Sequence, residues 1–545
     1  MLRTASDGGR ASSFESNSSV LSSSVQQQEL PAWSPSSTLF GLPSIDESHT
    51  FTFDTTPMED LSMDFMPAQI DMSEQSMYLN WTSAQSSTPA QPVETTRTRE
   101  RLISLYYAHF HPAHPFLMPQ TTYIENPSMM PSNLQRAMQV VGNQFIVAQD
   151  RHRLDLIPLD IFPDVSTVDF YSVQTLLVLA LAFYGRENIP ASLLAVQKAS
   201  SMANELHMHD ASAVSAMAGG NAVLEESLVR TWWELASMVA LLSTFASSTA
   251  LCTAKLRRGN LALPQEDEGY GASSLAVVKR TQSQFNDRTL FNDTHEYSSL
   301  AYKIEASRLL MAVQESGMGS MSMDRQRVLM NCLANFQLSM PVKKRESIQP
   351  DGHVDETLVQ AKTIASVASI LVSQLPDRSL TDTKGNKSGF VTPYDDRRSG
   401  ILSKSSVRPT PMALQAADSI ADAASTRSLT CTVMCHSPFY IGATELACAV
   451  HLVAYAHAEG ETSRELIKER IKLSVNALTR IGENWPLAQE VSQKVIQDVK
   501  TVMSGGCSED EDTISTTAQN HGAFDDHRPM DAWQSNNAAF PIGNF

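Results

Sequence analysis

The chain has 545 residues, of which 42% are apolar and 18% are charged, and its formal net charge is −18. This length allows a sizeable buried core, whereas the acidic balance and the lack of a long Lys/Arg block argue against a general DNA-binding surface. The sequence has no apolar run of about 18 residues and no apolar signal segment at its start, so we expect an intracellular protein without a membrane span. Six scattered cysteines favour reduced thiols over a disulfide framework.

Residues 1–95 are predicted to be disordered, in two parts of different composition. The first, 1–40, is rich in Ser and Gln and has few apolar residues to offset the entropy of ordering. The second, 41–80, has eight Asp and Glu, no Lys or Arg, and interspersed Phe, Leu and Met. This composition is typical of an activation segment that folds as a short helix in a partner groove, and equally of an acidic linker. For an activation segment, the predicted contact residues are Phe51, Phe53, Leu61, Phe65 and Met66.

From residue 96 to about 503, apolar residues recur at three- and four-residue steps, which predicts helices. Alternating patterns of the kind that a sheet needs are nearly absent, so the predicted fold class is all-α, a single large multi-helix domain flanked by disordered ends. We divide it into a helical part at 96–375, an exposed polar insert at 376–412, C-terminal helices of the same domain at 413–503 and a disordered acidic tail at 504–545. The predicted helices cover 97–110, 169–184, 190–208, 221–245, 297–316, 323–338, 355–375, 439–458, 463–482 and 486–503.

Some of these helices allow more specific predictions. The segments 169–184 and 439–458 are apolar on most faces, which indicates central helices with neighbours all round. The helix at 463–482 opens with "TSRE", where the Thr462 hydroxyl and the Glu465 carboxylate can form a capping box. The helix at 221–245 has a clear apolar stripe, and its charged residues mostly fall away from that stripe. These charged residues are Glu225, Glu226, Arg230 and Glu234.

Three histidines, His109, His111 and His114, lie within six positions in "HFHPAH". Such a cluster raises the question of a metal site. Pro112 and Pro115 prevent a regular helix from placing the three on one face, and no Cys or carboxylate lies nearby at ligand spacing. The sequence therefore argues against metal binding here.

The same stretch is better interpreted as the entry to the helical domain. Pro112 and Pro115 stop the first helix and turn the chain, because proline lacks the backbone N–H that a helix needs. Phe110 and Phe116 are then expected to pack inward, and the histidines to cap and satisfy the turn.

Other candidates for chemistry are weak. Cys431, Cys435 and His436 lack a second close pair that would complete a tetrahedral zinc site. No Gly-rich phosphate loop, nucleophile elbow or H-E-x-x-H motif occurs. The aspartate pairs at 394–399 and 525–527 lie in polar segments that do not line a pocket. We therefore assign no catalytic, cofactor-binding or metal-binding residue and predict that the protein is not an enzyme.

Two short basic clusters occur, at 255–258 and 341–345. The second, "PVKKR", follows an apolar helix in a break that starts with proline, so Lys343, Lys344 and Arg345 can serve as a nuclear import signal. Short basic runs are also common on ordinary solvated surfaces, and this interpretation stays open.

Several stretches together resemble the fungal-specific transcription factor domain, the middle homology region found downstream of a binuclear zinc cluster in regulators of the xylanolytic activator type. The stretch "LYYAHFHPAHPFL" resembles its opening, and 172–210 resembles its central helix pair, which normally ends in a Gly-Leu-His-Arg-like sequence where this chain has His207 and Asp210. The helix "LEESLVRTWWELASMVALLSTFAS" resembles its tryptophan-pair helix, and later segments up to 503 resemble its C-terminal helices. The residues that carry this structural signature are His109, Pro112, Pro115, Trp232, Trp233 and Trp485.

This resemblance implies a nuclear fungal transcription regulator of a specialised, secondary-metabolite gene set, without a cofactor in this chain. Its implied partners are the transcriptional machinery or coactivators, a DNA-binding regulator, or a second copy in a homodimer. No cysteine precedes Cys252, so the family's six-cysteine cluster is not found and direct DNA binding is open. Either the chain acts as a coregulator, or an exon for the cluster lies upstream of the recorded start. A third interpretation is a ligand-sensing helical module, which predicts a cavity in the helical core.

Overall fold

The computed structural model describes residues 96–146, 167–246, 259–266, 270, 279–290, 295–317, 323–349, 352, 354–373, 408–430 and 437–505. The chain divides into two units, Met1–Ala84 and Gln85–Phe545, and all of these residues belong to the second. The predicted disordered segments, most of the insert at 376–412 and the tail beyond 505 lie outside them.

The described residues form an all-α fold, as predicted, with one isolated antiparallel bridge between Ile348 and Val354. Short 3-10 or π turns extend several of the helices. The elements are α2 (Thr96–Leu105), η1 (Tyr106–Phe110), α3 (Gln120–Glu125), η2 (Pro127–Met129), α4 (Ser132–Gly142), η3 (Asn143–Phe145), α7 (Phe170–Gly185), α8 (Ile189–Glu205), α9 (Ala211–Ala218), α10 (Ala222–Phe245), α11 (Gln282–Asp287), α12 (Ser299–Gly317), α13 (Met323–Leu338), α14 (Val342–Arg345), α15 (Glu356–Ser373), α16 (Pro411–Thr430), α17 (Phe439–Ala456), α18 (Glu461–Ile481) and α19 (Pro486–Gly505).

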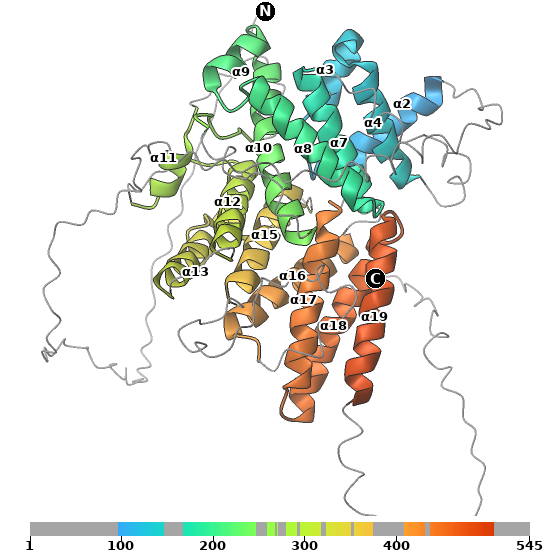
Figure 1. Cartoon of the computed structure of the whole chain (residues 1–545), viewed down its shortest axis with the longest axis vertical. Helices are drawn as coiled ribbons and strands as arrows, with labels where there is room; N and C mark the ends of the chain where they lie inside the picture. Colours follow the sequence, from blue (N-terminus) through green and yellow to red (C-terminus); the bar gives the residue numbers. More distant parts are fainter. Residues whose placement is uncertain are drawn as a thin grey trace, which may run out of the picture. The chain divides into compact units, whose positions relative to one another are not determined.

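Helix α10 connects two groups of helices (Figure 1). On one side it packs against α7, α8 and α9, and α7 in turn packs against α4. On the other side it packs against α12, which pairs with α15, and α15 leads to the group formed by α16, α17, α18 and α19. A long helix in this position is surrounded by neighbours, so it buries most of its surface.

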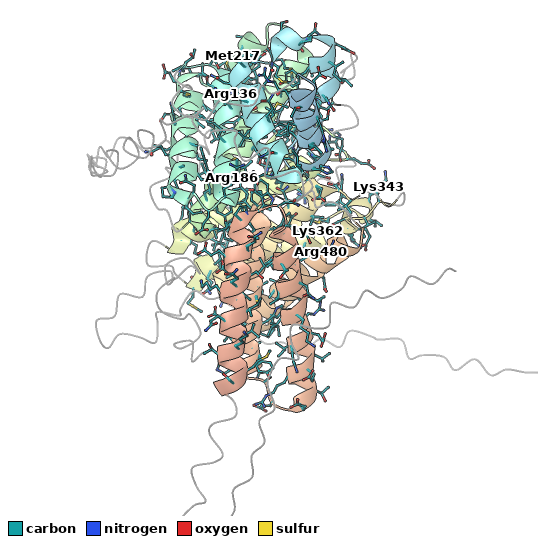
Figure 2. All side chains as sticks on the ribbon, turned by 90° about the vertical axis from the view of Figure 1, so that its right-hand side faces the viewer. Arg136, Arg186, Met217, Lys343, Lys362 and Arg480 are labelled. Carbon is teal, nitrogen blue, oxygen red and sulfur yellow. The ribbon has the colours of Figure 1, made fainter. Side chains whose placement is uncertain are left out.

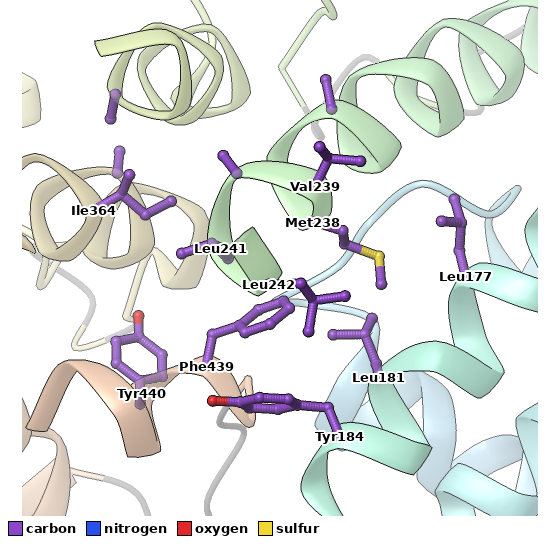
Figure 3. Packing of buried hydrophobic residues seen from close by; sticks show 14 of the residues in the cluster. Leu177, Leu181, Tyr184, Met238, Val239, Leu241, Leu242, Ile364, Phe439 and Tyr440 are labelled. Atoms are coloured by element: carbon purple, nitrogen blue, oxygen red, sulfur yellow. The ribbon is translucent and has the colours of Figure 1, made fainter. Parts of the chain in front are cut away.

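The apolar core is continuous across these groups (Figure 3). Leu242 of α10 lies close to Leu181 of α7, and Leu241, on another face of α10, points toward α15. The Tyr184 and Phe439 rings, from α7 and α17, lie 5.1 Å apart at their centroids. Burying this surface drives folding at roughly 25 cal/mol per Å² of apolar area, so the described helices stabilise one another through a shared core.

Helix α17 is long and apolar enough to cross a membrane, with a mean hydropathy of 1.4 over 18 residues. However, 78% of it is buried inside the structure. Its packing is that of a central helix, which is the role predicted for 439–458.

An Asp or Asn side chain caps the N-terminus of each of the four successive helices α7, α8, α9 and α10. The side chain of this residue accepts a hydrogen bond from a backbone N–H in the first turn, and the caps are Asp169, Asn188, Asp210 and Asn221.

The capping box predicted for α18 is wrong. The helix starts earlier, at Glu461, after Gly460, and no side chain caps it. Gly460 has a φ of +88°, a conformation that glycine adopts without strain and that turns the chain before Thr462 is reached. Thr462 therefore lies inside the first turn, and Glu465 accepts a hydrogen bond from Lys468 Nζ at 2.9 Å instead.

A Schellman motif ends α8. Met208 N–H donates to the Ala203 carbonyl at 2.9 Å and His207 N–H to the Asn204 carbonyl at 3.1 Å. This motif needs a left-handed residue after the C-cap, usually glycine. Here that residue is His207, with a φ of +52°, at the position where the resembling family has glycine.

We expect His207→Gly to raise the free energy of unfolding by about 0.5–1 kcal/mol, because the left-handed conformation costs a residue with a Cβ roughly 1–2 kcal/mol and glycine regains part of that. Urea unfolding of the two proteins measures the change. Glu205→Gly, in the last turn of the same helix, is the matched control and should lower stability by about 1 kcal/mol. Equal effects of the two glycines would contradict the strain at residue 207.

Candidate functional site

The chain turns sharply between His111 and Pro119, and we call these residues the His-Pro turn. The helix formed by α2 and η1 ends where His111 N–H donates to the Tyr106 carbonyl at 2.9 Å. His114 N–H then bonds back to the His111 carbonyl at 3.0 Å. Phe110 and Phe116 are both 1% exposed, so their predicted inward packing is confirmed.

Side chains from distant parts of the sequence bind the backbone carbonyl groups of the His-Pro turn. A buried carbonyl group needs a hydrogen-bond donor, and a turn that contains three prolines has few backbone N–H groups to offer. The missing donors come from α10, α15, Tyr270, Tyr107 of η1 and His111 of the turn itself. The bonds are Gln360 Nε2 to Ala113 (2.5 Å), Arg230 Nη1 to Pro115 (3.1 Å), Ser227 Oγ to Phe116 (2.8 Å), Tyr270 Oη and His111 Nε2 to Leu117 (3.0 and 3.2 Å), and Tyr107 Oη to Met118 (2.9 Å).

A buried charged triad lies beside the turn. Glu234 of α10 receives His114 Nδ1–H on Oε1 at 2.6 Å and Lys303 Nζ of α12 on Oε2 at 2.7 Å. No side chain of the three is more than 3% exposed. Burial alone would raise the pKa of Glu234, but the Lys303 ammonium and His114 outweigh it and lower that pKa to about 2. Glu234 is therefore ionised at neutral pH and neutralises Lys303.

His114 carries no net charge in this triad at neutral pH. Burial lowers the pKa of its imidazole below the usual 6.5, despite the opposite effect of Glu234. The buried Nε2 atom has no hydrogen-bond partner, which fits a neutral ring protonated at Nδ1. The prediction that the histidines cap the turn therefore fits His111, whereas His114 serves to connect the turn to α10.

A second buried ion pair lies one helical turn before Glu234. Arg230 Nε donates to Glu226 Oε1 at 2.8 Å, and Arg230 Nη2 donates to the Gln265 carbonyl at 2.8 Å. The Gln265 backbone N–H in turn donates a hydrogen bond to Glu226 Oε1 at 2.9 Å. The guanidinium also lies 3.9 Å from the centre of the Tyr270 ring. Arg230 thus uses its planar fork to hold the His-Pro turn, Gln265 and Tyr270 against α10.

Three of the charged residues that fall away from the apolar stripe of α10 are buried. Glu226, Arg230 and Glu234 are 7%, 1% and 3% exposed, so α10 is buried nearly all round. Their four-residue spacing places them on one stripe of the helix. That stripe faces the His-Pro turn and α12, which supply the opposite charges and carbonyl groups.

The three histidines of "HFHPAH" have separate partners. The His109 ring packs at a tilt against Phe145 with centroids 5.3 Å apart, His111 bonds to the Leu117 carbonyl, and His114 bonds to Glu234. Within the described ranges, no group of three or more His, Cys, Asp or Glu side chains is arranged to hold a metal ion. Cys431, Cys435 and His436 lie outside those ranges.

The tryptophans of the structural signature pack into the fold. Trp232 is fully buried, and Trp233 Nε1 donates to the Ala262 carbonyl at 3.1 Å. Trp485 is buried in the break between α18 and α19, as predicted. The sequence does not reveal the buried polar cluster on α10, formed by Glu226, Arg230 and Glu234. Most hydrogen-bonding groups of this cluster bind other parts of the fold.

Over 404 residues the chain is 25% identical to the C6 finger domain transcription factor iacK of Pestalotiopsis fici. The alignment covers 73% of this chain and 58% of the relative, so the chain spans less than two thirds of that protein's length. This similarity supports a relationship to fungal zinc cluster regulators. No family profile matches the chain, and no solved structure matches it.

The residues predicted for nuclear import lie on α14. Lys343 Nζ is 2.5 Å from Glu296 Oε1, and Lys344 Nζ is 2.5 Å from Glu266 Oε1. Lys343 is well exposed, whereas the Lys344 side chain is only 16% exposed. The import signal stays a prediction. The predicted activation residues, Phe51, Phe53, Leu61, Phe65 and Met66, lie outside the described residues.

Two small cavities lie among the described helices. One of about 80 Å³ is lined by residues of α10, α11 and α12, including Trp233, Gln282 and Arg308. The other, of about 10 Å³, is lined mainly by apolar residues of α10, α15 and α17. Drug-sized ligands occupy pockets of roughly 300–1,000 Å³, so neither cavity holds such a ligand. The ligand-sensing interpretation therefore gains no support from these two cavities.

Proposed function

We propose that this chain is a fungal transcription regulator and that its helical domain is a regulatory module. The 404-residue similarity to a C6 finger domain transcription factor carries the proposal. The all-α fold and the structural use of the buried polar cluster are consistent with it, because Glu234, Arg230 and His114 bind parts of the fold rather than facing a substrate pocket.

The regulator acts in the nucleus through protein contacts, with coactivators or with a DNA-binding regulator. Segment 41–80 supplies the contact surface, since its acidic residues keep the apolar side chains solvated until a partner groove binds them. The regulated genes belong to a specialised metabolic pathway, as the family resemblance implies.

A tethered reporter tests this proposal. The full chain is fused to an unrelated DNA-binding domain, and reporter output is compared with that of the DNA-binding domain alone. The wild-type fusion should activate, and combined alanine substitution of Phe51, Phe53, Leu61, Phe65 and Met66 should lower output at least tenfold. A tenfold loss needs only about 1.4 kcal/mol of partner binding free energy.

The matched control replaces five serines of the 1–40 segment by alanine, and it should leave output unchanged at equal protein level. These serines are Ser12, Ser13, Ser16, Ser18 and Ser19. Full activity of the aromatic variant would reject the activation segment. A wild-type fusion no more active than the DNA-binding domain alone would reject activation by this chain.

A further inference from the structure

Between α14 and α15, an isolated antiparallel bridge lies next to Ser347 in the sequence. Ile348 and Val354 form this bridge, and Asp355 N–H donates to the Ser347 carbonyl at 2.8 Å. Ser347 itself is half-buried. Its hydroxyl lies beside α15, where it contacts Lys362.

Lys362 of α15 faces this hydroxyl. Its Nζ atom donates to Ser347 Oγ at 3.0 Å and to the Arg345 carbonyl. Burial lowers the pKa of the Lys362 ammonium, although Glu346 and Asp355 act in the opposite direction. The environment of this cation is therefore short of negative charge.

The neighbouring lysines differ from Lys362 in this respect. Lys343 and Lys344 each pair with a glutamate at 2.5 Å. Among the described residues, no carboxylate lies within ion-pair distance of Lys362. Figure 2 labels Lys343 and Lys362. A half-buried ammonium with only neutral oxygen partners is a favourable place for an added anion.

We propose that Ser347 is a phosphorylation site and that Lys362 binds its phosphate. Arg345, Lys344 and Lys343 lie two, three and four positions before Ser347. This charge pattern suits a serine kinase with an acidic substrate groove. The kinase transfers the γ-phosphoryl group of ATP: the bond from phosphorus to Ser347 Oγ forms, the bond to the ADP oxygen breaks, and the hydroxyl proton passes to the kinase's carboxylate base.

The phosphate adds roughly −1.5 to −2 charges and three acceptor oxygens at this position. Lys362 is the cation within direct reach. Asp355 opposes the phosphate less than its charge suggests, because its carboxylate already accepts hydrogen bonds from Ser299 Oγ at 2.6 Å and from Leu358 N–H at 2.9 Å. Glu346, next to Ser347, adds some repulsion.

The added charge also lies beside the basic residues of α14. If the proposed nuclear function holds, phosphorylation of Ser347 weakens the binding of Lys344 and Arg345 to an acidic import receptor. This consequence rests on the proposed function, whereas the modification itself does not.

The purified full chain tests the modification directly. It is incubated with the catalytic subunit of cAMP-dependent protein kinase and Mg-ATP, and the modified residues are mapped by mass spectrometry. We expect phosphate on Ser347 in the folded protein, none at this position in Ser347→Ala, and a rate at least tenfold lower in Arg345→Gln. Labelling of other serines but not of Ser347, or of Ser347 only after heat denaturation, would overturn the proposal.

A separate measurement tests whether Lys362 binds the phosphate. The second pKa of phosphoserine, ordinarily about 6, should be lower by about one pH unit beside the Lys362 ammonium in a phosphorus NMR titration. Lys362→Gln should restore the ordinary value, and Lys343→Gln, which removes a more exposed lysine, should not. Identical titrations of all three proteins would reject Lys362 as the phosphate ligand. Because these experiments use purified protein, their failure is distinguishable from failure of the reporter assay.

Discussion

Glu234→Gln lowers the free energy of unfolding by about 3–5 kcal/mol, because it leaves the buried Lys303 ammonium without a counter-charge. The amide oxygen of glutamine can still accept a hydrogen bond from Lys303, and its NH2 group can donate to His114 Nδ1 once the imidazole proton moves to Nε2. The variant therefore removes charge while preserving the shape of the side chain. Urea unfolding monitored by circular dichroism measures the change.

Two further variants isolate the cause. Glu225→Gln alters the neighbouring α10 carboxylate, whose partner Lys279 is 61% exposed, and should cost less than about 1 kcal/mol. Adding Lys303→Met to Glu234→Gln removes the uncompensated charge and should restore most of the lost stability. A loss below about 1 kcal/mol for Glu234→Gln would show that Lys303 does not depend on this carboxylate.

The effect of Glu234→Gln should also depend on pH. The folded pKa of Glu234 is about 2, below the ordinary value of 4.5, so the unfolded chain binds this proton more readily. The stabilisation is fully present above about pH 5 and is lost as the pH falls from 4.5 toward 2. The stability gap between wild type and variant should therefore shrink over that range, and a gap independent of pH would contradict the assignment.

Sequence reasoning found the long helices but not the polar cluster. The predicted ranges 169–184, 221–245 and 323–338 agree with α7, α10 and α13 within one residue at each end, because long runs with a helical period depend on local information. The charged residues of α10 fall away from its apolar stripe, and a single sequence gives no sign that they are buried, because charged residues are usually exposed. Their partners come from the His-Pro turn, residue 265 and α12, and a single sequence does not show which distant residues meet.

Helix α16 was not among the predicted helices, for a different physical reason. It begins at Pro411, so the last residues of the predicted insert, 411–412, belong to it. The residues that it buries are mostly small, including Ala413, Ala416 and Ala417. Alanine has the highest helix propensity but gives a weak apolar stripe, and a search for large apolar residues at helical spacing overlooks such a helix. The short helices α3, α9 and α11 were missed because a few residues carry little periodic signal.

Trp485→Ala should lower the free energy of unfolding by about 3–5 kcal/mol, the usual cost of truncating a buried tryptophan. The indole is 1% exposed and packs edge-on against Phe145, with centroids 6.1 Å apart. Gly185, the last residue of α7, leaves room for the ring, since a Cβ there would lie 2.2 Å from Trp485 Cε3. Trp485 therefore packs the segment between α18 and α19 against the C-terminal end of α7.

A double-mutant cycle with Gly185→Ala measures this packing. Gly185→Ala alone should destabilise the protein by about 1–3 kcal/mol through overpacking, but it should cost much less in the Trp485→Ala background, where the clashing ring is gone. Trp485→Phe should cost less than Trp485→Ala, because it keeps an aromatic ring and removes a buried indole N–H that has no partner. Leu466→Ala on the exposed face of α18 is the control, with an expected change within about 0.5 kcal/mol. Additive losses of stability for Gly185→Ala and Trp485→Ala would mean that the Trp485 ring does not pack against Gly185. The contact between α7 and the α18–α19 break would then need another explanation.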